Sequence, residues 1–110
     1  MANVATEVMA RTLGAEVRVP ALAEGRSLDV EAFWGIDPAR RLPAHGGSYL
    51  VVWDFGTDPP PPENVPNRAG DDPHGMGRGL PEVLGVATAF LEEGTLVDTC
   101  GGGPCRTLPE

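Results

Sequence analysis

A histidine beside two carboxylates is the clearest candidate for chemistry in this chain. His74 follows Gly70-Asp71-Asp72-Pro73, in a stretch rich in glycine and proline. Histidine changes protonation near neutral pH, and loop residues held by a rigid scaffold are common in catalytic sites. His74 is therefore a candidate proton shuttle, although a histidine in such a stretch is more often a solvated loop side chain.

Two cysteines form the second candidate group. Cys100 and Cys105 enclose Gly101-Gly102-Gly103-Pro104, a sequence that turns tightly enough to bring two sulfur atoms together. The spacing predicts a disulfide, which in a loop of this size contributes about 2 kcal/mol. Free thiols and a metal site are the alternatives. A metal site needs two further ligands, for which the sequence offers His45 and His74.

The predicted disulfide and the N-terminus point to different compartments. A disulfide indicates an oxidising environment, whereas residues 1–7 lack the basic and apolar segments of a secretion signal. A longer parent chain would reconcile the two observations. We therefore expect an extracellular or extracytoplasmic parent protein.

Charge and composition exclude several classes of partner. The formal net charge is −8, with 16 acidic residues and 8 basic ones. Nucleic acids and anionic membrane surfaces attract basic faces, so neither is expected as a partner. No stretch approaches the roughly 20 apolar residues of a transmembrane helix. The acidic pairs Asp71-Asp72 and Glu92-Glu93 match no calcium-binding loop, so no metal or cofactor is predicted.

Two main helices are expected to position these residues. Apolar residues recur at helical spacing over 4–13 and again over 80–93. Gly14 and Gly94 follow the two patterns, where a glycine often ends a helix. Pro81 fits the first turn of the second helix.

The strands and loops complete a small α/β chain. Residues 15–19 alternate between apolar and polar, and 95–98 form a further short strand. Residues 48–55 are continuously apolar, which predicts a strand covered on both faces. A sheet of two to three strands with two main helices follows, together with a long Pro/Gly-rich loop over 56–79. Two helices cover both sheet faces poorly, so 1–110 is predicted to be a single or a partial domain.

Several segments together resemble a known family. They are residues 49–57, 64–66, 71–75, 80–93 and 100–105. Their order is similar to the C-terminal part of secreted bacterial α/β-hydrolases of the lipase and esterase kind. The resemblance implies that His74 is the general base of a Ser-His-Asp triad acting on an ester or lipid. It offers Asp54, Asp58 and Asp72 as acid candidates.

The nucleophile of that family has no counterpart here. A Gly-x-Ser-x-Gly turn carries it, and neither Ser27 nor Ser48 stands in such a motif. A cysteine nucleophile would require Cys100 and Cys105 to be reduced. The resemblance thus implies a segment that supplies the histidine and is inactive alone. An upstream or partner polypeptide would complete its fold.

The alternative is a small non-enzymatic binding domain. The disulfide would stabilise this domain, and the Pro-rich loop would form its recognition surface. The two hypotheses differ in the surface that they predict. A partial domain exposes a large apolar face, whereas a complete domain covers residues 49–55 on both sides.

Overall fold

Helix α1 (Asn3–Leu13) opens the fold and confirms the first predicted helix. The computed structural model describes residues 3–27, 30–57, 63, 65 and 73–106. Gly14, with φ of +67°, ends the helix in the left-handed conformation that glycine adopts at low cost. The N–H of Ala15 then donates to the carbonyl of Ala10 at 2.9 Å, which turns the chain into the first strand.

Strand β1 (Glu16–Arg18) is the centre of a three-stranded parallel sheet. Its neighbours are β2 (Pro38–Ala39) and β4 (Tyr49–Leu50), and Val17 pairs with Pro38 on one side and with Leu50 on the other. The main apolar cluster joins this sheet to α1. Its buried members are Ala10, Ala15, Val17, Ala21 and Ile36.

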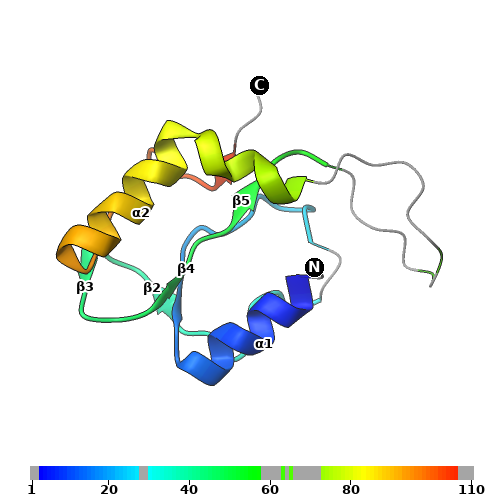
Figure 1. Cartoon of the computed structure of the whole chain (residues 1–110). Coiled ribbons are helices and arrows are strands. Elements are labelled where there is room, and N and C mark those ends of the chain that lie inside the picture. Colours follow the sequence, from blue (N-terminus) through cyan, green and yellow to red (C-terminus); the bar gives the residue numbers. More distant parts are fainter. Residues whose placement is uncertain (1–2, 28–29, 58–62, 64, 66–72, 107–110) are drawn as a thin grey trace.

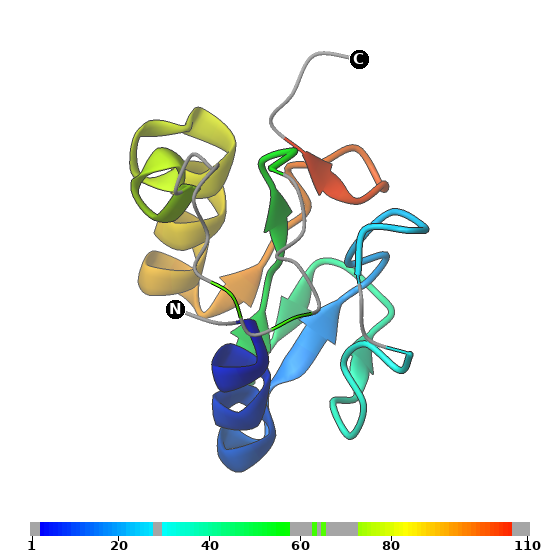
Figure 2. The ribbon, with the colours of Figure 1, turned by 90° about the vertical axis from the view of Figure 1, so that its right-hand side faces the viewer.

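Two further pairs of strands lie beside this sheet (Figures 1 and 2). β5 (Trp53–Asp54) runs parallel to β7 (Cys105–Arg106), and β3 (Ala44–His45) runs antiparallel to β6 (Thr95–Leu96). The result is an α+β arrangement with small sheets of two or three strands. This agrees with the prediction of two to three strands in a small sheet and of two main helices, although the strands form three sheets where a single one was expected.

The expected continuous strand over 48–55 is wrong in its details. The run is divided into β4 and β5, which pair with different neighbours. Every residue from Tyr49 to Phe55 is half-buried. Leu50 and Val52 pack against the main apolar cluster, which covers part of this run.

Helix α2 (Pro81–Glu93) confirms the second predicted helix. The 3₁₀ helix η1 (Pro73–Gly79) precedes it and corrects the prediction that 56–79 lacks regular structure. Gly77 lies close enough to Phe55 for a Cβ there to make van der Waals contact at 3.5 Å. In Figure 1, α2 lies at the upper left of the view and α1 at the bottom.

Candidate functional site

His74 lies in η1, between strand β5 and helix α2, and is exposed. The sequence analysis likewise placed this histidine after the apolar run over 48–55 and before the helix over 80–93. Two of its proposed acid partners, Asp58 and Asp72, lie outside the described residues. The triad assignment therefore stays a prediction for these positions.

The third acid candidate, Asp54, is held by an arginine. Nε of Arg26 donates to Oδ2 of Asp54 at 2.8 Å, and Nη2 donates to Oδ1 at 2.9 Å. The N–H of Gly56 adds a third hydrogen bond to Oδ1, at 2.8 Å. Arg26 is the main cause of the lowered pKa of Asp54. The carboxylate thus stays ionised and fixes the segment after β5, which is a structural role.

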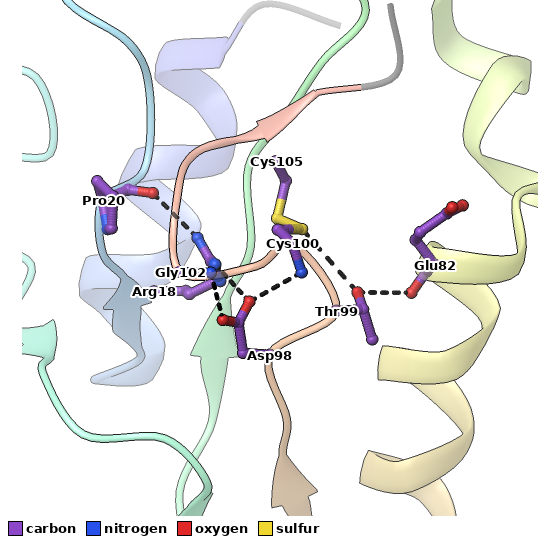
Figure 3. A network of polar contacts seen from close by, with 8 residues as sticks. All are labelled: Arg18, Pro20, Glu82, Asp98, Thr99, Cys100, Gly102 and Cys105. Atoms are coloured by element: carbon purple, nitrogen blue, oxygen red, sulfur yellow. Dashed lines mark hydrogen bonds and ion pairs between the residues drawn. A yellow bond between two sulfur atoms is a disulfide. The ribbon is translucent and has the colours of Figure 1, made fainter.

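The predicted disulfide between Cys100 and Cys105 is present (Figure 3). Asp98 organises the loop that it closes, because its carboxylate accepts the N–H of Cys100 at 2.9 Å and that of Gly102 at 2.7 Å. Arg18 donates to the same carboxylate at 2.6 Å. The Arg18 hydrogen bond is the largest cause of the lowered pKa of Asp98. An ion pair therefore fastens the cysteine loop to strand β1.

The buried position of Arg18 was not anticipated from the sequence. The residue is 2% exposed, and its Nη1 donates to the carbonyl of Pro20 at 3.0 Å. Its Nε has no hydrogen-bond partner among the described residues. The alternating pattern over 15–19 assigns Arg18 to the outer face of a strand. No local signal in the sequence indicates its burial, because its partner Asp98 lies 80 positions away.

The other histidine belongs to a strand pair. His45, which the sequence offered only as a possible metal ligand, is part of β3 and lies opposite Thr95 of β6. Its Nδ1 is 2.9 Å from Oγ1 of Thr95. Within the described ranges, no group of three His, Cys, Asp or Glu side chains could hold a metal ion. No helix among the described residues is long and apolar enough to cross a bilayer.

A shallow groove of about 410 Å³ lies beside the main apolar cluster. The chain from Val19 to Gly25 lines it, together with Ser27, Ala32 and Phe33. Phe33 has a positive φ of 65°, and its packing against the cluster holds this strained backbone. Glu24 and Ser27 carry the polar side chains of the lining. The groove therefore offers few groups that could orient a ligand.

The outer side of α2 is the most distinctive surface among the described residues. None of the residues of this fully described helix is buried. Leu84 is 49% exposed and Leu91 is 83% exposed, and Ala87 and Thr88 between them are exposed as well. These four residues stand at positions i, i+3, i+4 and i+7 and share one side of the helix. We call them the α2 face.

The opposite side of α2 packs against the rest of the molecule. Val83, Val86 and Ala89 are half-buried. The ring of Phe90 meets that of Tyr49 edge to face, with the centroids 6.1 Å apart. Thr99 donates its hydroxyl to the carbonyl of Glu82 at 3.0 Å, which joins the cysteine loop to the helix (Figure 3). The helix is thus fixed on one side and open on the other.

Helix α1 repeats this arrangement. Val8, Met9 and Leu13 are all at least half exposed, whereas Ala10 on the other side is buried. The fold and its surface define a small α+β domain with a disulfide and two helices that are apolar on their outer sides. No family model, curated protein or solved structure matches the chain.

Proposed function

We propose that this chain is a protein-interaction module that binds a polypeptide partner through the α2 face. The observation that carries the proposal is the pair of exposed leucines, Leu84 and Leu91, on a helix without buried residues. A helix that is apolar on nearly all sides is usually enclosed in protein. A partner polypeptide would provide the enclosure that this chain lacks.

The proposal keeps the binding-domain hypothesis of the sequence and changes its recognition surface. The Pro-rich stretch over 59–62 lies outside the described residues. The α2 face offers leucines at helical spacing, which is the pattern that amphipathic helices use when they dock. The disulfide and the Thr99 hydrogen bond hold the helix in place, so less freedom is lost on binding.

Site-specific photo-crosslinking in the cells that express the protein tests the proposal. With p-benzoylphenylalanine in place of Leu91, we expect a discrete adduct with a second polypeptide. The same probe in place of the exposed Arg40 is the matched control and should give no adduct. The adduct should disappear when Leu84→Ser is added. Equal labelling at both positions, or none at position 91, would refute the proposed function.

A second candidate function is that of a histidine donor in an α/β-hydrolase-like assembly. The observation that favours it is the exposure of His74 in η1, between a strand and a helix. In this role, the imidazole takes a proton from a nucleophile of another polypeptide and returns it to the leaving group. The chain alone then has no nucleophile to activate.

Ester hydrolysis and serine labelling test this second function. The chain alone should hydrolyse p-nitrophenyl butyrate no faster than its His74→Asn variant does. A fluorophosphonate probe should label neither Ser27 nor Ser48, because neither lies in a nucleophile turn. Serine-dependent turnover by the isolated chain would contradict the histidine-donor hypothesis.

A further inference from the structure

The groove beside the main apolar cluster begins where strand β1 ends. Val19 and Pro20, the first residues of its lining, directly follow Arg18, the last residue of β1. Strand β1 lies between β2 and β4 in a parallel sheet, so the chain passes to one neighbour and later returns to the other side. In open parallel sheets, ligands bind beyond the carboxyl ends of the strands at such a reversal of strand order. The groove therefore stands where this kind of sheet usually holds a ligand.

A strained residue forms part of the wall of this groove. Phe33 is half-buried, packs against the main apolar cluster and also lines the groove. Its φ of +65° is unfavourable for a residue with a bulky side chain. Such residues gather at ligand-binding sites, where the surrounding structure holds them in place. The strain at Phe33 thus supports a binding role for the groove.

Glu24 is the only charged side chain among the described residues that line the groove. It is exposed, and its carboxylate has no hydrogen-bond or ion-pair partner among the described residues. The two arginines nearest to it in the sequence are bound to other carboxylates. Arg18 pairs with Asp98 at 2.6 Å, and Arg26 pairs with Asp54 at 2.8 Å. A cationic ligand would therefore supply the counter-charge that Glu24 lacks.

We propose that this groove binds a small primary amine with an apolar body, of the arylalkylamine class. The ammonium group lies at Glu24, and the apolar body contacts Phe33 and the alanines of the lining. The volume of about 410 Å³ is in the range of small-molecule sites, and the net charge of −8 favours a cation over an anion. The site shares no residue with the α2 face, so it adds a second binding function to the proposed one.

Three ligands that differ mainly in charge can test this assignment. Phenethylamine is the probe, phenethyl alcohol is its neutral counterpart, and hydrocinnamate carries a negative charge beside the same ring. In magnetic resonance titrations of the isotope-labelled full chain, the amine should shift amide signals within 19–27 and 32–33. It should bind roughly twofold to fivefold tighter than the alcohol, as expected for an exposed ion pair, and hydrocinnamate should bind most weakly. This advantage should shrink in about 1 M NaCl, because salt screens the attraction.

Two pairs of variants separate the charge of the groove from its shape. Glu24→Gln should remove the advantage of the amine over the alcohol, whereas Glu31→Gln, exposed and outside the lining, should keep it. Ala23→Leu fills part of the groove and should weaken both ligands roughly fivefold, whereas Ala87→Leu on α2 should weaken neither. Circular dichroism checks the fold of Ala23→Leu, and the comparison of the two glutamate variants does not depend on it.

Three outcomes would overturn the inference. They are equal binding of the amine and the alcohol, equal effects of Glu24→Gln and Glu31→Gln, and amide shifts that lie outside the groove. A short peptide with an N-terminal phenylalanine carries the same ammonium and ring. Tighter binding of this peptide than of phenethylamine would overturn the small-molecule assignment in favour of a peptide end. All these outcomes leave the crosslinking result at position 91 unaffected, so the two proposals fail independently.

Discussion

Asp98 connects strand β1 to the disulfide loop through one carboxylate. It accepts hydrogen bonds from Arg18 in β1 and from the backbone of Cys100 and Gly102 in the disulfide loop. The lowered pKa of Asp98 means that the folded state binds a proton at this group less readily than the unfolded chain does. Asp54, held by Arg26, has a lowered pKa for the corresponding reason.

We expect the stability of the protein to fall as these two carboxylates are protonated. A carboxyl with a lowered folded-state pKa stabilises the fold above its unfolded pKa, which is about 3.9 for aspartate. The contribution is lost as the pH falls below that value and through the folded pKa. Urea unfolding between pH 7 and pH 2 should therefore show stability decreasing below about pH 4.

Asp98→Asn tests whether Asp98 carries part of this dependence. The variant should be less stable by about 2 kcal/mol at pH 7, because it leaves the buried Arg18 without its counter-charge. It should also lose less stability than the parent on acidification. The pH dependence of stability that remains is expected to come from Asp54. Glu24→Gln, at an exposed site, is the control. An unchanged pH dependence in Asp98→Asn would show that the ion pair contributes little.

The structural roles of some of these residues can be predicted from the sequence, and those of others cannot, for physical reasons. The disulfide is predictable because Gly101-Gly102-Gly103-Pro104 can adopt a tight turn whatever surrounds it. The burial of Arg18 is not predictable because it depends on Asp98, which lies 80 positions away in the sequence. The role of Asp54 depends in the same way on Arg26, which is distant in sequence.

Local signals predict the helices better than the strands. Both main helices were predicted nearly to their ends, because Gly14 and Gly94 terminate them through their own positive φ. The strands are only two or three residues long, and their pairing depends on distant segments. The division of residues 48–55 between two sheets therefore has no local signal.

Gly85→Ala is expected to stabilise helix α2. A Cβ at this position would lie 3.5 Å from Cγ2 of Thr99, an ordinary van der Waals distance. Alanine in place of glycine within a helix contributes about 0.5–1 kcal/mol. Thermal unfolding followed by circular dichroism should show a midpoint higher by about 4 °C.

Gly94→Ala is the matched control for that variant. Gly94 has a φ of +65°, and its N–H donates to the carbonyl of Phe90 at 2.8 Å to close the helix. Alanine is strained in this conformation, so the variant should lose about 1 kcal/mol. A gain of stability at position 94, or a loss at position 85, would contradict this description of α2.

The molecule as a whole has a thin core. Half of the buried apolar residues among those described are alanines, namely Ala10, Ala15, Ala21 and Ala39. Small side chains remove little surface from water, so each contributes less than a buried leucine would. Several large apolar residues of α1 and α2 lie instead on the outer sides, namely Val8, Met9, Leu13, Leu84 and Leu91. Hydrophobic residues that would enlarge a self-sufficient core are thus placed where a partner can reach them.

A thin core makes the disulfide important for the whole molecule. Cys105 is 1% exposed and lies in β7, which pairs with β5, while Cys100 follows the segment that binds Arg18 and Glu82. Replacing both cysteines with serine should lower the free energy of unfolding by about 2 kcal/mol, since the unfolded chain gains freedom. Urea unfolding at neutral pH measures this loss.

Hydrogen exchange can locate the part of the molecule that this loss of stability affects. In the double serine variant, the amides of β5 and β7 should exchange faster relative to the parent than those of β1, which is held between two parallel neighbours. Adding a dithiol reductant to the parent should reproduce the pattern, whereas the serine variant should not respond to it. Uniform acceleration across all strands would mean that the disulfide supports the entire fold rather than one edge of it. Selective acceleration would mean that the β1 sheet and α1 form a unit that remains folded when the cysteine loop opens.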